Sequence, residues 1–246
     1  MSIETPEELA GLRATGRVVA EALRAMRRAV RPGVTTGELD MIAARIFRRA
    51  GARSAPRLTY GFPGATCISV NDEAVHGIPG RRRLRAGDLV SLDVAAELDG
   101  FYADACVTVG VGRARPATNR LAAAARHALA QGLAAARAGE PQSVIGAAVE
   151  RAVTARGYAV CSELMGHGIG RGLHEAPDVP SVYDAALTDR LTDGLVLTIE
   201  PIVSTGSGAV RPGRDGWTVR TADGTLSAHE EHTVVITAGA PLVLTA

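Results

Sequence analysis

Two carboxylates, Asp93 and Asp104, occupy positions where a β-hairpin would bring them together. Two runs of alternating residues flank the pair Asp99-Gly100, which is a strong signal for a two-residue turn. Such a turn places Asp93 opposite Cys106 and makes Asp104 its diagonal neighbour on the same face of the hairpin. Diagonal positions on paired strands lie roughly 7 Å apart at the backbone, so we expect the two acids to be close.

Two carboxylates at that separation repel each other and raise each other's pKa unless something positive lies between them. A divalent cation is the simplest such group. The alternative is a solvated hairpin face with two unrelated acids. The metal hypothesis therefore depends on whether other ligands converge on the same place.

A glycine-rich segment, GHGIGRGLHEAP at residues 166–177, carries two imidazoles, His167 and His174. Alternating glycines let the backbone approach other groups closely and disfavour a helix. Their spacing does not satisfy the G-x-G-x-x-G pattern of a dinucleotide-binding loop. A single histidine is more often a satisfied core residue, whereas two in such a segment are also consistent with a ligand site.

Two strand-like stretches each carry a further acid. Glu200 lies inside the apolar run LVLTIEPIV, which is typical of a strand buried on both faces, and a buried Glu requires a partner or a metal ion. Pro201 cannot donate to a β-ladder, so we expect the strand to bulge or to lie at an edge there. In SAHEEHTVVIT the second histidine comes too early for the zinc helix H-E-x-x-H, and a strand places His229 and Glu231 on one face.

The sequence HGI occurs twice and supplies a further histidine. The candidate ligands are then four carboxylates and three imidazoles, namely Asp93, Asp104, Glu200, Glu231, His76, His167 and His174. Oxygen-rich ligands with few nitrogens and no thiolate favour Mn²⁺, Fe²⁺, Co²⁺ or Zn²⁺, and the summed negative charge calls for two ions. Two ions roughly 3.5 to 4 Å apart can acidify a bridging water near neutral pH, which indicates hydrolytic chemistry.

Caps and stop signals predict four helices around these stretches, over residues 6–30, 37–50, 118–137 and 143–156. The second pair of helices repeats the first at a nearly constant spacing. Gly33 recurs as Gly139, which is 106 residues later (139 minus 33), and Asp93 recurs as Glu200, which is 107 residues later (200 minus 93).

This repetition predicts two copies of one unit, over about residues 5–112 and 116–237. Two such copies would pack around a pseudo-two-fold axis with their acids meeting at the centre. Because no linker-like stretch divides them, we expect a single domain over residues 1–246.

The composition excludes several classes of function. The chain has 246 residues and is 46% hydrophobic, so it is long and apolar enough to bury a hydrophobic core. Its net charge of +1 is too small for a typical nucleic-acid-binding protein. The basic cluster at residues 81–85 is then expected to be a solvated loop. Three scattered cysteines do not form a disulfide framework, and no signal peptide or membrane span is evident, so we expect a cytoplasmic protein.

The combination of motifs in this sequence resembles the type I methionine aminopeptidases. The motifs are HGIP, the spacing of Asp93 and Asp104, GHGIGRGLHEAP, TIEP and the EEHT strand. The resemblance extends from the first predicted helix to about Thr237. It implies an α+β pita-bread fold, in which two halves related by a pseudo-two-fold axis form a central antiparallel sheet covered by helices. It also implies hydrolysis, at a dinuclear metal centre, that removes the N-terminal methionine from nascent proteins and peptides when the second residue is small.

The resemblance assigns roles to the candidate ligands. By it, Asp93 binds one divalent ion, Asp104 and Glu231 bridge both ions, and His167 and Glu200 bind the other. Glu200 also relays a proton when hydroxide attacks the first peptide carbonyl.

Further residues are implied to contact the substrate. His76 and His174 match imidazoles that contact the substrate amide and stabilise the tetrahedral intermediate. Cys67 and Trp217 fall where related enzymes line the pocket for the methionine side chain.

The resemblance also implies a monovalent cation near Asn71 and Ser227. The implied partner is the N-terminal methionine of nascent polypeptides. We expect a monomer that binds neither nucleic acid nor a membrane, and a transient association with the ribosome is compatible with this expectation. The chain begins almost at its first helix, so we do not expect the N-terminal extensions of some relatives, or ribosome docking through them.

Departures from the family pattern lie at the pocket rim, at Val75, Thr59, Tyr60 and Leu173. They affect the expected pocket shape and efficiency but not the metal ligands. Two alternatives belong to the same fold. An X-Pro aminopeptidase-type hydrolase usually carries a further N-terminal domain, and a non-catalytic pita-bread binding module would have lost metal ligands.

Overall fold

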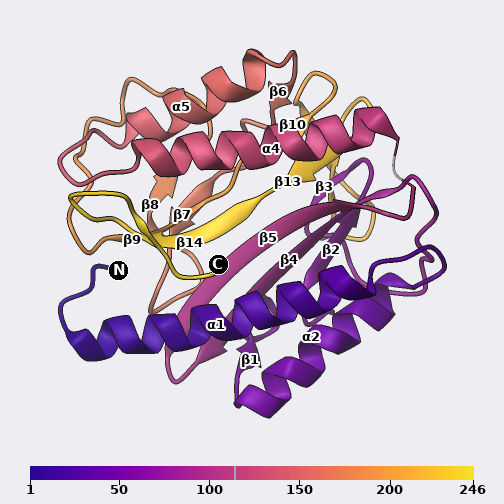
Figure 1. Cartoon of the computed structure of the whole chain (residues 1–246), viewed down its shortest axis with the longest axis horizontal. Coiled ribbons are helices and arrows are strands. Elements are labelled where there is room, and N and C mark those ends of the chain that lie inside the picture. Colours follow the sequence, from indigo (N-terminus) through magenta and orange to yellow (C-terminus); the bar gives the residue numbers. More distant parts are fainter. Residues whose placement is uncertain (114) are drawn as a thin grey trace.

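The computed structural model describes residues 1–113 and 115–246 of the chain. Its helices are α1 (Pro6–Ala29), α2 (Thr36–Ala50), α3 (Ala55–Tyr60), α4 (Pro116–Ala135) and α5 (Ser143–Thr154). In Figure 1 the pair α1 and α2 runs along the lower side of the molecule and the pair α4 and α5 along the upper side, with strands between them. Within the described residues, none of the helices combines the length and apolar character needed to cross a membrane.

Most strands belong to one large antiparallel sheet. They are β1 (Arg53–Ser54), β2 (Cys67–Val70), β4 (Leu89–Leu98), β5 (Phe101–Gly110), β7 (Gly166–Gly168), β8 (Glu175–Val179), β9 (Val196–Ile199), β14 (Glu231–Val235) and β15 (Leu242–Val243). The order is β1-β4-β5-β14-β9-β7-β8, with β2 paired to β4 and β15 paired to β14.

Two small sheets complete the fold. One has the order β13-β10-β6 and the other β11-β12-β3. Their strands are β6 (Ala159–Val160), β10 (Ile202–Ser204), β13 (Ser227–His229), β3 (Glu73–Val75), β11 (Val210–Pro212) and β12 (Val219–Thr221). The predicted α+β pita-bread architecture with a central antiparallel sheet is confirmed.

The hairpin of β4 and β5 has the predicted register. Leu98 pairs with Phe101, and Asp93 lies opposite Cys106. Asp99 and Gly100 both have positive φ values, of 52° and 83°, as a tight two-residue turn requires.

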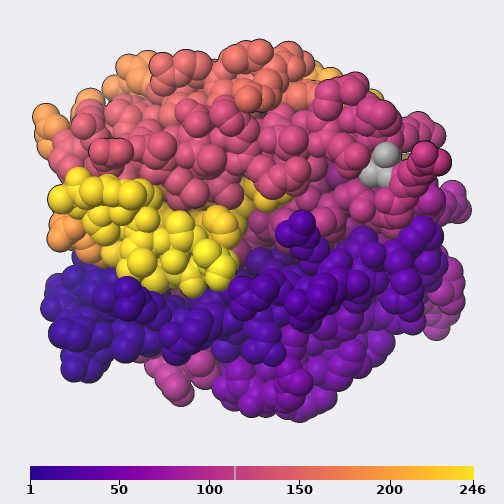
Figure 2. Space-filling model, in the orientation of Figure 1, coloured from indigo at the N-terminus to yellow at the C-terminus, as the bar shows by residue number. Residues whose placement is uncertain are grey.

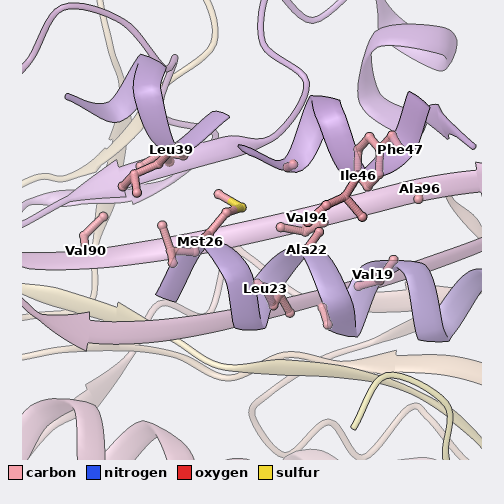
Figure 3. Close-up of a cluster of buried hydrophobic side chains, with 14 of the residues drawn as sticks. Val19, Ala22, Leu23, Met26, Leu39, Ile46, Phe47, Val90, Val94 and Ala96 are labelled. Carbon is pink, nitrogen blue, oxygen red and sulfur yellow. The ribbon is translucent and has the colours of Figure 1, made fainter. Parts of the chain in front are cut away.

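Side chains alternate along a strand, so successive residues of this hairpin point to opposite faces, and the two faces have different surroundings. One face packs on α1 and α2 through Val90, Leu92, Val94 and Ala96 of β4 and through Ala103 and Ala105 of β5. Figure 3 shows Met26 of α1 and Ile46 of α2 close to Val94 in this cluster. The other face therefore carries Asp93 and Asp104, with a packed core behind them.

Helices α1 and α2 begin where the sequence predicts. Thr5 and Thr35 each form a capping box, in which the threonine hydroxyl accepts a hydrogen bond from the N–H of the glutamate three residues later. The carboxylate of that glutamate accepts a hydrogen bond from the threonine N–H. Helices α4 and α5 pack against each other and against β9, β10, β13 and β14. The order of two helices followed by strands thus occurs twice along the chain, and the duplication itself stays a prediction.

A two-stranded ribbon passes from the large sheet into a small one. Ile199 of β9 pairs with His232 of β14, and a few residues away Ile202 of β10 pairs with His229 of β13. The pairing is interrupted at the same place on both strands, between β9 and β10 and between β13 and β14. At this interruption the N–H of Glu230 donates to the carbonyl of Pro201 at 3.4 Å.

This break corrects two expectations. The strand with Glu200 neither bulges nor lies at an edge, because β9 lies between β14 and β7 and simply ends before Pro201. Residues 227–237 are likewise not one strand but two, interrupted at Glu230. The missing N–H of Pro201 ends the ladder, and the paired strand breaks with it.

The C-terminal segment fills the space between the two halves. In Figure 2 it forms a surface patch, yellow by sequence position, between α1 and the helices of the second half. Leu244 contacts α1 at Gly16, where a Cβ would lie 2.2 Å from the Leu244 carbonyl oxygen. Only glycine permits this close approach of two backbones.

Candidate metal centre

All four predicted carboxylates and His167 converge between the halves of the chain. Asp93 and Asp104 come from β4 and β5, Glu200 follows β9, and Glu231 begins β14. Ligand atoms of Asp104, His167 and Glu231 lie within 4.8 Å of one another. A second group with the same spacing consists of Glu200, Glu231 and His229.

The clustering of acids raises their pKa values. Burial, then the charges of Asp104 and Glu200, hold the pKa values of Asp93 and Glu231 well above the usual range. Burial raises the pKa of Asp104 to about 6, and burial with the charge of Asp104 raises that of Glu200 to about 8. Four such groups cannot all ionise near neutral pH without a compensating positive charge.

Unpartnered atoms show where that charge belongs. Among the described residues, three buried side-chain atoms have no hydrogen-bond partner, namely Asp104 Oδ1, Glu231 Oε1 and His229 Nε2. Buried polar atoms are normally satisfied, and here all three face one cluster of acids. Oxygen and imidazole nitrogen are the donors that divalent Mn, Fe, Co and Zn accept, so these residues fit divalent metal ions.

The imidazole of His167 is held in the tautomer that a ligand needs. Its Nδ1 lies 2.8 Å from the carbonyl oxygen of Gly168. Because a carbonyl can only accept, Nδ1 carries the hydrogen and Nε2 is left with a lone pair. That Nε2 lies 3.7 Å from Glu200 Oε2. Burial, with a smaller effect of His174, lowers the pKa of His167 to about 4, which keeps the ring neutral.

Threonine hydroxyls fix the backbone around the cluster. The Thr233 hydroxyl accepts from the Asp104 N–H at 2.9 Å and donates to the Asp104 carbonyl at 2.7 Å. The Thr198 hydroxyl accepts from the His167 N–H and donates to Glu200 Oε2, each at 3.0 Å. These bonds reduce the freedom of the carboxylates to move apart.

Two cavities meet at the acids. One, of about 230 Å³, is lined by Asp93 and Asp104 together with a mostly apolar wall of Pro56, Tyr60, Phe62, Cys67, Ala95, Leu173 and Trp217. The other, of about 240 Å³, is lined by Asp93, Asp104, His167, Glu200, His229 and Glu231 with Val75 and residues 163–165. His76 and His174 line both.

The apolar cavity contains both residues predicted for it, Cys67 and Trp217. Cys67 lies opposite Asp93 in the pairing of β2 with β4. Phe62 meets Trp217 edge to face, with ring centroids 5.2 Å apart. Three of the predicted departures from the family pattern, Tyr60, Leu173 and Val75, also lie in the walls of the two cavities.

His76 and His174 lie at the mouth of the cavities and are solvent-accessible. Loss of surrounding water lowers the pKa of both imidazoles, and His174 lowers that of His76 further. The Tyr60 hydroxyl lies 2.6 Å from His174 Nδ1. If the phenol donates this bond, the N–H of His174 is on Nε2.

Asn71 and Ser227 are in direct contact, as their predicted common site requires. The Ser227 N–H donates to the Asn71 carbonyl at 2.9 Å. Sequence reasoning placed His229 on the correct face but did not include it among the ligands, and it did not place Phe62 in the pocket. The aromatic run around Phe62, in YGFPG, was the available signal for the latter.

Comparisons with known proteins give one consistent result. The model of metallopeptidase family M24 matches residues 10–238. Methionine aminopeptidase 2 of Bacillus subtilis strain 168 is 42% identical over 247 residues, covering 100% of this chain and 99% of that protein. The crystal structure of methionine aminopeptidase from Thermotoga maritima matches with a TM-score of 0.96 and 36% identity, covering 100% of this chain and 99% of that one.

A more distant structure shares the fold alone. Prolidase from Pyrococcus furiosus matches with a TM-score of 0.79 at 21% identity, covering 99% of this chain and 65% of that one.

The raised pKa values predict how the metal-free protein responds to pH. A folded-state pKa raised above its unfolded value gives stability that is lost as pH rises through the folded pKa. Between about pH 7 and 8.5 histidines are neutral in both states, so the slope is set by the buried carboxyl groups with raised pKa values. These are Glu200 at about 8, Glu230 at about 7, and Asp93 and Glu231 well above their usual range. We expect the free energy of unfolding of chelator-treated protein, measured in urea, to fall across this window. Glu200→Gln should make the fall shallower without abolishing it, and a rising wild-type curve would contradict the clustering of acids.

The contact of Tyr60 with His174 predicts a kinetic effect. Tyr60→Phe removes the hydroxyl that orients the imidazole, and a neutral hydrogen bond contributes about 0.5–1.5 kcal/mol. We expect kcat for release of an N-terminal residue to fall roughly threefold to tenfold, with little change in KM. Tyr183→Phe, at an exposed tyrosine outside both cavities, is the control. Equal kcat values for all three proteins would show that the hydroxyl does not orient His174.

Proposed function

This chain belongs to metallopeptidase family M24, and we propose that it removes the N-terminal methionine from nascent proteins and peptides whose second residue is small. Full-length relatives at about 40% identity are named methionine aminopeptidases. The observation that carries the proposal is the position of the acid cluster, at the junction of an apolar cavity with a polar one. A bond cut there would separate an apolar side chain from the rest of a peptide.

The family binds divalent metal, and we propose two ions per chain, of Mn, Fe, Co or Zn. Asp93 would hold one ion, His167 and Glu200 the other, and Asp104 and Glu231 would bridge them. The raised pKa values of the acids support two ions, because one divalent cation leaves two negative charges uncompensated. Bound ions would supply Lewis acidity that lowers the pKa of a water molecule toward about 7.

The remaining groups act on the substrate and its protons. Glu200 lines the polar cavity beside the other acids, and once bound cations keep its carboxylate ionised it can accept a proton from the attacking water and pass it to the leaving amine. His174 and His76, which are neutral near pH 7, can donate N–H groups to the oxygen of the first peptide carbonyl. These roles follow from position at the cavity mouth and from protonation state.

Methionine recognition is assigned to the apolar cavity. Cys67 and Trp217, with Phe62, would contact the thioether side chain. Burial and the charge of Asp93 hold the pKa of the Cys67 thiol well above its usual range, so this cysteine is a neutral wall residue rather than a nucleophile.

Further proposals complete the account. A monovalent cation would bind near Asn71 and Ser227, where carbonyl and hydroxyl oxygens gather. The chain would act as a monomer and a single catalytic domain of two repeated halves, with a transient association with the ribosome. The three cysteines are unpaired, in keeping with a cytoplasmic location.

The two alternatives receive less support. The prolidase at 21% identity shares the fold alone, so it does not favour cleavage of X-Pro bonds. A non-catalytic module would have lost ligands, whereas all five proposed ligand residues are present and line one cavity.

Peptide hydrolysis tests the proposal. We expect the protein supplied with Mn²⁺, Co²⁺ or Fe²⁺ to release methionine from Met-Ala-Ser on the order of tenfold faster, or more, than from Met-Leu-Ser. Leu-Ala-Ser and Ala-Pro-Ser are the controls for the first residue and for X-Pro cleavage. No methionine from Met-Ala-Ser with any of the three ions would refute the assignment, and preferential cleavage of Ala-Pro-Ser would favour the alternative.

A further inference from the structure

His229 is a buried imidazole beside the five proposed ligand residues, and it has no role in the proposed reaction. It ends β13 and is 3% exposed. The Thr108 hydroxyl accepts from the His229 N–H at 2.9 Å and donates to its carbonyl at 2.6 Å. This is the same two-bond arrangement that Thr233 makes with Asp104. The backbone of His229 is therefore fixed as firmly as that of a proposed bridging ligand.

The ring of His229 has an unsatisfied nitrogen aimed at the acid cluster. Its Nε2 is buried without a hydrogen-bond partner, as are Asp104 Oδ1 and Glu231 Oε1. The nearest acid oxygen, Glu231 Oε2, lies 3.7 Å away, which is too long for a hydrogen bond. A structural histidine at full burial would be expected to have a partner for this nitrogen.

The distance instead suits two ligands of one metal ion. With bonds of about 2.0–2.2 Å to nitrogen and oxygen, two ligand atoms of one ion lie between roughly 3 Å apart, at a right angle, and roughly 4.2 Å apart, on opposite sides, and 3.7 Å falls within this span. His167 Nε2 and Glu200 Oε2, which we assign to one ion, are also 3.7 Å apart. Ligand atoms of His229, Glu200 and Glu231 all lie within 4.8 Å of one another.

We propose that His229 is a further ligand of the metal centre, binding through Nε2 the ion that Glu200 and Glu231 share. The centre then has two imidazoles, His167 and His229, among four carboxylates. Imidazole nitrogen favours Co²⁺ and Zn²⁺ over the harder Mn²⁺, so His229 would shift the metal preference of the chain toward the former.

This inference rests on the metal centre of the proposed function, and the test separates the two. Co²⁺ is added to chelator-treated full-length protein, and proton NMR counts the paramagnetically shifted N–H signals of bound imidazoles. We expect two such signals in the wild type. His167→Gln should remove one and His229→Gln the other, while His127→Gln, on α4 away from both cavities, should leave both.

If the His229 variant does not fold, the number of signals in the wild-type spectrum still shows whether one or two imidazoles bind metal. A single signal that His167→Gln abolishes would refute the role of His229 and leave the centre intact. No signal at all would refute the centre together with the inference.

Metal affinity provides an independent reading. Calorimetric titration with Co²⁺ should show one of two binding steps weakened tenfold or more in His229→Gln, because loss of a ligand-shell group typically costs 10-fold to 100-fold in affinity. Mn²⁺ binding should weaken less than Co²⁺ binding. Unchanged affinity for both ions at both steps would show that His229 is not a ligand.

Discussion

Repulsion among four carboxylates at the centre of the molecule is the constraint on which the rest of the structure depends. Asp93, Asp104, Glu200 and Glu231 are brought together from both halves of the chain, and their pKa values are all raised. Left alone, such a cluster would separate or take up protons. The packed helices behind the hairpin and the threonine hydroxyls beside it hold the acids in place, so that metal ions can supply the compensating charge.

The break in the β9–β10 and β13–β14 ribbon lies at the metal centre. A continuous ribbon would keep Glu200 and Glu231 in one regular ladder with alternating faces. Instead the chain leaves the large sheet at Pro201 and Glu230, and the strands continue in a small sheet. Glu200, His229 and Glu231 lie at this junction of the two sheets and line the polar cavity, which shares Asp93 and Asp104 with the apolar one.

Much of this arrangement could be predicted from the sequence because it depends on local signals. The turn at Asp99-Gly100 determined the register of the hairpin, and threonine caps determined where α1 and α2 begin. The roles of single residues came from a family resemblance and could not come from spacing alone.

What could not be predicted depends on contacts between distant segments. The sequence indicates an irregularity at Pro201, but the change of sheet also requires a break at Glu230 in the paired strand, where the sequence looks continuous. Helix α3 has only six residues, and its signals, Ser54 as N-cap and Gly61 as C-cap, are weak without their neighbours. The unpartnered nitrogen of His229 becomes visible only when β13 is placed beside β5 and the ends of β9 and β14.

The central claim is that the clustered carboxylates hold two divalent ions, and anomalous X-ray diffraction tests it most directly. Crystals grown with Co²⁺ and measured on both sides of the cobalt absorption edge locate each ion without reference to activity. We predict two anomalous peaks among Asp93, Asp104, Glu200 and Glu231, separated by roughly 3.5 to 4 Å. A map with no peak within this cluster, while cobalt is bound elsewhere on the chain, would contradict the account.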